Sequence, residues 1–207
     1  MSWYSKVAWS EGLFLRQHHL QQNDRYLERL IENRVRSVSP YPWGFSAIEI
    51  DRDLAQQNKF ALRRASGVFQ DGTPFDMPGS SPLPLAIDLP EGAERQLVWM
   101  TMPAAAVNSR EVDMPGANTG SRYSRDIEPI IDSSSGMHLE QEIEVAHPRI
   151  AFEVRKTPKT GFHCLKLARV LEVRDKTIVF DETFAPPVLV SHAHPVVAGW
   201  LERVIGW

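Results

Sequence analysis

The sequence predicts a mainly β fold, a β-sandwich with one helix before it and another after it. Between residues 43 and 190 the chain consists of short apolar and polar runs separated by turn residues. Before this stretch, apolar residues recur at helical spacing, and a second helical pattern starts at Pro195. We therefore expect three regions: an aromatic segment with a helix (residues 1–42), a β region (43–190) and the start of a helix (191–207).

The first region joins an aromatic segment to a helix. Trp3, Trp9, Phe14 and Leu15 make this segment too apolar for a solvated tail, so these side chains need a surface to cover. Two interpretations stay open: the side chains anchor the chain on a partner, or they are buried in its own sandwich. The helix is predicted over residues 16–36, because leucines recur on one face and two prolines follow it.

The β region shows period-two alternation in several short runs, typical of strands with one buried face. The alternating apolar positions are Ile48 and Ile50, Phe60 and Leu62, and Ile150, Phe152 and Val154. The run Leu97–Met100 is apolar throughout and predicts a strand buried on both faces. Asp71-Gly72 and Asp175-Lys176 are typical turn pairs.

One segment of the β region fits two structures. In residues 162–174 polar side chains recur every third position, at His163, Lys166, Arg169 and Glu172. This spacing fits a helix or a strand with a bulge, and the strand-like flanks favour the strand.

The last region predicts a helix with a wide apolar face. Its apolar residues include Val197, Trp200, Leu201, Val204 and Trp207, and the pattern is still running at the final residue. A short helix with so much apolar surface is marginal alone, so it needs the β region, a longer bundle or copies of itself.

Composition excludes several classes of protein. The 207 residues include 23 Lys and Arg against 26 Asp and Glu, a net charge of −3, which leaves no basic excess for binding nucleic acid. The single cysteine, Cys164, excludes an intrachain disulfide framework and fits a reducing compartment. No apolar run approaches the roughly 20 residues of a membrane-spanning helix. These observations predict a cytoplasmic protein that does not insert into a membrane.

No group of residues forms a legible catalytic, cofactor or metal site, so we expect a protein that is not an enzyme. Cys164 sits in an apolar run typical of a buried thiol. Asp71 and Asp76, or a glutamate within 140–144, are the only acid and base pairs that a hydrolase would offer. A turn explains the former and a solvated strand face explains the latter.

Five motifs follow one another along the chain: Lys6–Gln21 (KVAWSEGLFLRQHHLQ), Gly67–Asp76 (GVFQDGTPFD), Leu167–Val170 (LARV), Phe184–Pro187 (FAPP), and His194-Pro195 leading into Trp200-Leu201. In these motifs and in their order, over essentially the whole chain, the sequence resembles the TssK (ImpJ/VasE) family of type VI secretion baseplate subunits. The chain departs from the family pattern at Arg16 and Gln70, where proline is expected, and at Ala185, where a larger apolar residue is usual.

The resemblance implies a β-sandwich shoulder similar to that of phage receptor-binding proteins, followed by a helical neck and a head. It implies a homotrimer that docks on the wedge proteins TssF and TssG through the shoulder and reaches the membrane-complex proteins TssL and TssM through the head. Family members are longer, so this chain is expected to hold the shoulder and the first turns of a truncated neck.

On this basis Trp3, Trp9, Phe14 and Leu15 are candidates for a partner interface, and the apolar face of the last helix is a candidate for the trimer contact. The alternative function, drawn from the fold alone, is a phage-tail-like module that binds a receptor or carbohydrate.

Overall fold

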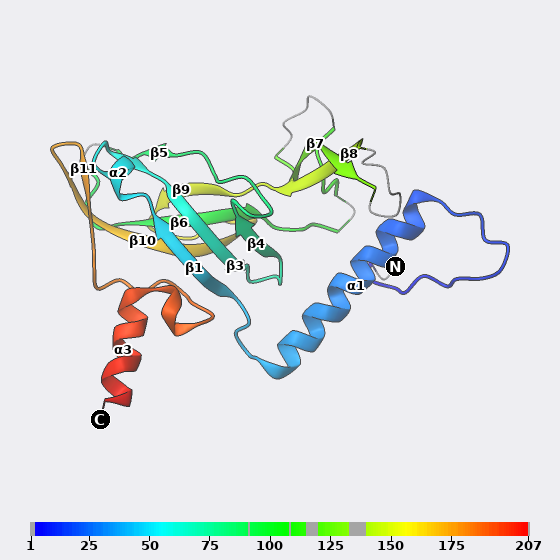
Figure 1. Ribbon diagram of the computed structural model, residues 1–207, viewed down its shortest axis with the longest axis horizontal. Coiled ribbons are helices and arrows are strands. Elements are labelled where there is room, and N and C mark those ends of the chain that lie inside the picture. The colour runs from blue at the N-terminus through cyan, green and yellow to red at the C-terminus, as the bar shows by residue number, and fades with distance from the viewer. Residues whose placement is uncertain (1–2, 91, 108, 115–119, 133–139, 207) are drawn as a thin grey trace. The chain divides into compact units, whose positions relative to one another are not determined.

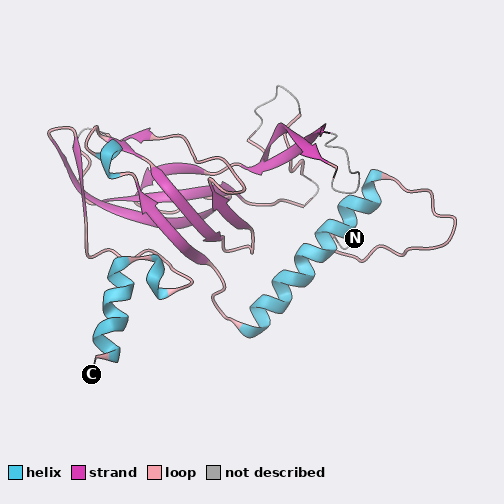
Figure 2. Cartoon of the chain, viewed as in Figure 1, coloured by secondary structure: helices cyan, strands magenta, loops and turns pink. Residues whose placement is uncertain are grey.

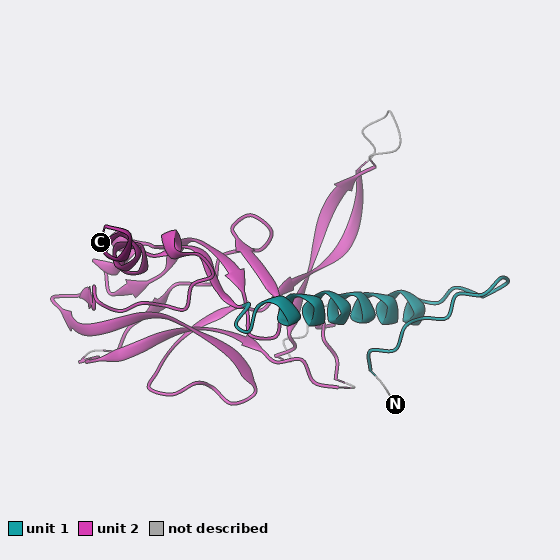
Figure 3. Cartoon of the chain, turned by 90° about the horizontal axis from the view of Figure 1, so that it is seen from below, with its two compact units in different colours: residues 1–42 teal, residues 43–207 magenta. Residues whose placement is uncertain are grey.

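The computed structural model describes most of the chain in two compact units, residues 1–42 and residues 43–207 (Figure 3). The described residues are 3–90, 92–107, 109–114, 120–132 and 140–206.

The first unit is built on one helix, α1 (Gln17–Val38), as the apolar spacing predicts. Its first turn is closed by the His19 ring, whose Nδ1 accepts from the Arg16 backbone N–H at 3.0 Å. The helix ends at Val38, because Ser39 after it is extended and Pro40 follows. A residue before proline is pushed out of the helical region, so the chain cannot continue the helix there.

The second unit contains two main sheets (Figures 1 and 2). The three-stranded sheet has the order β1 (Gly44–Ile50), β3 (Leu62–Val68) and β4 (Pro74–Met77). The four-stranded sheet has the order β11 (Thr177–Phe180), β10 (Phe162–Arg174), β6 (Gln96–Pro103) and β9 (Ala151–Arg155). Neighbouring strands are antiparallel throughout both sheets.

Smaller elements complete this unit. Two short strands pair with each other, β2 (Lys59–Phe60) and β5 (Ile87–Asp88). A long hairpin is made of β7 (Tyr123–Ile131) and β8 (Glu140–Pro148). The helical elements are α2 (Arg52–Ala55), a 3-10 turn (Ser191–Ala193) and α3 (Pro195–Ile205).

One apolar core lies between the two main sheets, which makes the unit a β-sandwich and confirms the predicted fold class. Side chains from both sheets belong to the same cluster of buried residues. Its largest fully buried members are Phe45, Phe60, Phe69, Met77, Val98, Met100, Met102, Leu165, Leu167 and Val170. Within the core cluster, aromatic rings meet edge to face, as in the contact of Phe60 with Phe152 of β9 at 5.2 Å between centroids.

The central strands β6 and β10 explain the two unusual sequence patterns. Val98 to Met102 of β6 are all buried, which confirms a strand covered on both faces. Residues 162–174 form β10, a strand, and its pairing with β6 shifts register between Lys166 and Ala168. This bulge adds one residue, so the exposed positions Lys166 and Arg169 are three apart instead of two.

Both predicted turn pairs form turns. Asp175 and Lys176 join β10 to β11 with φ angles of 49° and 62°, the left-handed pair that suits a two-residue hairpin. Gly72 has φ 91°, and the Asp71 carboxylate accepts from the Thr73 backbone N–H at 3.1 Å, which closes the turn between β3 and β4.

The segment after β11 runs along β1. Phe45 of β1 donates its N–H to the Pro187 carbonyl at 2.9 Å and accepts from the Leu189 N–H at 2.8 Å. Gly44 permits this approach, because a Cβ there would lie 2.8 Å from the Pro187 carbonyl oxygen. The contact fixes where the 3-10 turn and α3 leave the sandwich.

No helix within the described ranges is both long and apolar enough to cross a membrane.

Candidate partner-binding surfaces

In the first unit, the aromatic segment packs back on α1 of the same chain. Arg25 stacks over the Trp3 ring at 4.2 Å from its centroid, and Arg29 lies 5.2 Å from the Tyr4 ring centroid. Gln22 donates to the backbone carbonyls of Trp3 and Ser5, at 3.2 and 2.7 Å. The start of this segment is therefore held by polar and cation–π contacts with α1.

The other three interface candidates are more exposed than Trp3, which is half-buried. Trp9 is 53% exposed, and its ring lies tilted to the His19 ring of α1 at 6.3 Å between centroids. Phe14 is 79% exposed and Leu15 is 55% exposed. These three side chains leave apolar surface available to a partner.

A bare apolar stripe runs along α1 on the side opposite this segment. It consists of Leu20, Leu27, Ile31, Val35 and Val38, all of which are exposed. At 3.6 residues per turn these positions fall within about 80° of one another, whereas the residues that contact the aromatic segment centre on the opposite face.

In the second unit, the β7–β8 hairpin projects from the sandwich as a two-stranded ribbon (Figure 3). Its register is continuous from Tyr123 opposite Pro148 to Ile131 opposite Glu140. Glu140, Glu142 and Glu144 lie on one face of β8 and are exposed, as the sequence predicts for a solvated strand face.

The base of β7 is anchored by the buried guanidinium of Arg122. This side chain is 7% exposed and forms an ion pair with Asp71. It also donates to the Thr73 hydroxyl and, at 3.0 Å, to the Pro103 carbonyl. The ion pair therefore ties the start of the hairpin to the β3–β4 turn and to the end of β6.

The charge on Asp71 is set by two neighbouring side chains, those of Arg122 and His163. Burial alone would raise the pKa of this carboxyl, but Arg122 and His163, whose Nε2 lies 3.3 Å away, lower it below its ordinary value. Asp71 is therefore an ionised structural anchor, which removes it as the protonated acid of a hydrolase.

A second buried ion pair anchors the other strand of the hairpin. Asp113 is 2% exposed and pairs with Arg149, which follows the end of β8. Arg149 also donates through Nε to the Ser121 carbonyl at 3.0 Å, and its backbone N–H donates to the Arg122 carbonyl at 2.9 Å. Each strand thus leaves the sandwich beside an ion pair that has one buried member, Arg122 or Asp113.

The apolar face of α3 is open within this chain. Trp200 is 48% exposed, Leu201 is 43% exposed and Val204 is 73% exposed, while Val197 is half-buried. Trp207, the remaining candidate on this face, lies outside the described residues. The helix begins with Pro195 in its first turn, where the missing N–H costs nothing.

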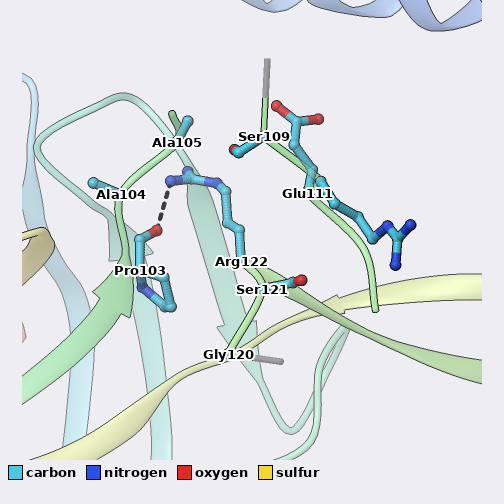
Figure 4. A pocket seen from close by; sticks show the side chains of 9 residues that line it. Pro103, Ala104, Ala105, Ser109, Glu111, Gly120, Ser121 and Arg122 are labelled. Carbon is cyan, nitrogen blue, oxygen red and sulfur yellow. Dashed lines mark hydrogen bonds between the residues drawn. The ribbon is translucent and has the colours of Figure 1, made fainter. Parts of the chain in front are cut away.

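Two small surface depressions among the described residues gather no set of catalytic side chains. One of about 270 Å³ lies beside Arg122, and Figure 4 shows the guanidinium of that residue turned to the Pro103 carbonyl. Its lining includes one carboxylate, that of Glu111. Cys164 is buried, as the sequence predicts. Within the described ranges no three histidine, cysteine or acidic side chains come together as a metal site.

Sequence comparison places the chain in a family. A family model described as Bacterial Type VI secretion, VC_A0110, EvfL, ImpJ, VasE matches residues 19–207. The chain belongs to this family. The match confirms the resemblance carried by the ordered motifs.

A curated relative in the family is the type VI secretion system baseplate component TssK1 of Pseudomonas aeruginosa. It is 34% identical over 208 aligned residues, covering 100% of this chain and 47% of that protein. The chain therefore spans about half the length of this curated relative.

Solved structures share the fold. A crystal structure of TssK superposes with a TM-score of 0.87 at 28% identity, covering 98% of this chain and 46% of that one. A chain in a cryo-electron microscopy structure of a TssK-TssF-TssG baseplate subcomplex superposes with a TM-score of 0.85 at 20% identity, covering 98% of this chain and 68% of that one.

Sequence reasoning missed β7 and both buried ion pairs. Asp71 was identified as a turn residue, but its partner Arg122 lies 51 positions away. The Gly67–Asp76 motif was the available signal, because it carries both Asp71 and Thr73, which hold the Arg122 guanidinium.

Proposed function

We propose that this chain is a structural, non-enzymatic adaptor of a type VI secretion baseplate. Its β-sandwich would serve as the shoulder that docks on the wedge proteins TssF and TssG in the cytoplasm. The observation that carries the proposal is the alignment of the whole chain with a baseplate component, TssK1. The likeness in fold to a chain of a TssK-TssF-TssG subcomplex supports the choice of partners.

The exposed aromatic segment is the first candidate for the wedge contact. Trp9, Phe14 and Leu15 offer apolar surface, whereas Trp3 is already engaged by Arg25. We therefore narrow the interface to the first three, since interface cores favour exposed aromatic anchors that a partner can bury.

Co-purification with the TssF and TssG proteins of the same bacterium tests this function. The 207-residue chain should bind them, and Phe14→Ala should weaken binding about tenfold, the cost of about 1.4 kcal/mol at a hot spot. Tyr41→Ala is the matched control, because Tyr41 is also an exposed aromatic of the first unit, at 74%. A wild-type chain that never associates with the two proteins would refute the function.

The apolar face of α3 is the candidate for self-association. We propose that α3 begins a neck in which Trp200, Leu201 and Val204 pack around a three-fold axis with Val197 and Trp207. A longer protein of this kind would be a homotrimer and would reach TssL and TssM through a head beyond the neck.

The oligomeric mass in solution distinguishes a trimer held by the neck from a trimer held by the shoulder alone. The 207-residue chain should be mainly monomeric at micromolar concentration, and a chain extended through the neck should be trimeric, because association depends on the buried helical surface. Light scattering on both chains gives the answer. A tight trimer of the short chain, or a monomer of the extended one, would contradict the proposed neck.

A further inference from the structure

The β7–β8 hairpin is a ribbon with both faces open. Among the described residues, β7 and β8 form a sheet with each other and with no other strand. Exposed isoleucines mark both strands, with Ile127 at 59%, Ile130 at 44%, Ile131 at 52% and Ile143 at 44%. A lone two-stranded hairpin is marginally stable in water, and another protein surface packed against its apolar side chains would stabilise it.

The register divides the ribbon into two faces. Residues opposite each other in an antiparallel pair share a face, and neighbours along a strand alternate. One face, here called the glutamate face, therefore carries Ile127, Pro129 and Ile131 of β7 and Glu140, Glu142 and Glu144 of β8. The other face carries Asp126, Glu128 and Ile130 of β7 and Gln141, Ile143 and Val145 of β8.

The two faces differ in how far their charges are satisfied. On the glutamate face, Glu144 pairs with Arg125 at 2.6 Å, whereas Glu140 and Glu142 have no ionic partner within the described part of the chain. On the other face, Glu128 contacts His147 at 2.9 Å, and Asp126 accepts from the Ile127 N–H at 2.8 Å. The glutamate face thus combines free carboxylates with two exposed isoleucines.

The charge of the hairpin identifies the chemistry of a partner. Its strands carry five carboxylates against one arginine, Arg125, whereas the whole chain has a net charge of only −3. A concentrated field of one sign attracts the opposite sign and disfavours like charge. Two copies of the glutamate face would repel each other, so a second copy docked face to face does not fit.

We propose that the glutamate face of the β7–β8 hairpin docks on a protein surface that presents lysine or arginine side chains around apolar ones. Resting on the proposed baseplate role, the inference identifies this basic surface as part of the TssF–TssG wedge. The isoleucines supply the apolar contact, and Glu140 and Glu142 set its orientation and its salt dependence. The buried ion pairs Asp71–Arg122 and Asp113–Arg149 hold the base of the ribbon, so the face is presented in a fixed direction.

The experiment reverses charge on one face at a time. Glu140→Lys/Glu142→Lys changes the charge of the glutamate face by four units, and Asp126→Lys/Glu128→Lys makes the same change on the opposite face. Binding of each variant to the purified TssF–TssG proteins is measured at low and at physiological salt. We expect the first variant to lose at least about tenfold in affinity and the second less than about threefold. The loss should shrink as salt rises.

A second pair of variants tests the apolar part. Ile127→Ser lies on the glutamate face and Ile143→Ser lies on the other, and only the first should weaken binding. Circular dichroism of each variant checks that the strands still form.

Each outcome decides between the proposals. If the wild-type chain does not bind the wedge proteins, the proposed function fails. If the wild type binds and both charge-reversed variants bind equally well, or lose affinity equally, the assignment of the glutamate face is wrong. If the first variant keeps wedge binding but loses self-association in light scattering, the occupant is a second copy and the assignment to the wedge is overturned.

Discussion

Replacing Arg122 with methionine should destabilise the sandwich unit strongly. Methionine keeps much of the apolar length of the side chain but leaves the Asp71 carboxylate, the Thr73 hydroxyl and the Pro103 carbonyl without their shared donor. Removing one partner of a buried pair costs about 3–5 kcal/mol. Because the Asp71 side chain is 21% exposed and keeps His163, we expect the lower end, about 3 kcal/mol.

The matched control is Arg63→Met. Arg63 has more acidic neighbours, with Asp51 at 3.4 Å, Glu49 at 4.0 Å and Asp53 in direct contact, but its side chain is 48% exposed. Water screens such pairs, so this substitution should cost far less unfolding free energy than Arg122→Met. Burial, and not the number of ion pairs, is thus the quantity under test.

Urea unfolding followed by the β-sheet signal in circular dichroism measures both variants. This signal reports the second unit, since every described strand lies in it. With a slope of about 2–3 kcal/mol per molar urea, Arg122→Met should lower the midpoint by about 1 M and Arg63→Met by less than about 0.5 M. Equal shifts, or a larger shift for Arg63→Met, would refute the reasoning.

Four further predictions concern single residues. Gly67→Ala should lower the unfolding free energy by about 2–3 kcal/mol, because the new Cβ would lie 2.2 Å from the carbonyl oxygen of Gly44, the first residue of β1. Gly92→Ala, at φ 74° in open space, should lower it by about 1 kcal/mol. Urea titration measures both values. Stability should fall as the pH drops below about 6.5, because burial lowers the pKa of His194 in the folded chain and the unfolded chain then binds the proton more readily. It should fall again below about pH 4, where the lowered pKa values of Asp71, Asp51 and Asp181 stop favouring the folded state, and Asp71→Asn should reduce this lower step in the unfolding free energy measured against pH. Trp200→Ser, at a position 48% exposed, should change the unfolding free energy of this chain by less than about 0.5 kcal/mol but weaken association of a neck-extended chain in sedimentation.

The parts of the fold that were predictable are those with a local hydrophobic signal. The end of β1 alternates in sequence because its two sides meet different environments, with half-buried Ile48 and Ile50 on either side of exposed Glu49. The continuous apolar run of β6 and the three-residue spacing of exposed residues in β10 also follow directly from which side chains are buried. The period of α1 was legible for a different reason, since its exposed apolar residues fall on one stripe although none of its residues is buried.

β7 escaped prediction because the hairpin has no buried face. Its sequence, YSRDIEPII, places charged residues and a proline among the isoleucines on both sides of the ribbon. Without burial there is no reason for apolar residues to repeat every second position, so the strand leaves no such pattern. Pro129 within it is tolerated because both strands of a two-stranded ribbon are edge strands.

The anchors of the hairpin were unpredictable for a different reason. Asp113 and Arg149 lie 36 positions apart, and the 26 acidic and 23 basic residues of the chain allow hundreds of such pairs. Only the fold selects which of these pairs become buried. The stacking of Arg25 over Trp3 is likewise selected by the fold and not by a local sequence pattern. In it, the start of the aromatic segment contacts α1 of its own chain.

The Asp71–Arg122 ion pair connects the β3–β4 turn to the β7–β8 hairpin, although the two lie far apart in sequence. The Asp71 carboxylate closes its own turn through the Thr73 N–H and at the same time holds Arg122 at the foot of β7. A buried ion pair adds little net stability compared with apolar side chains in its place. Its two side chains can nevertheless adopt few other positions, because moving them apart would leave a buried charge uncompensated. Two such pairs at the base therefore restrict the direction of the β7–β8 hairpin, which forms a two-stranded sheet of its own. That restriction is what an interface on a protruding hairpin requires, since a surface already oriented loses less conformational entropy when its partner binds.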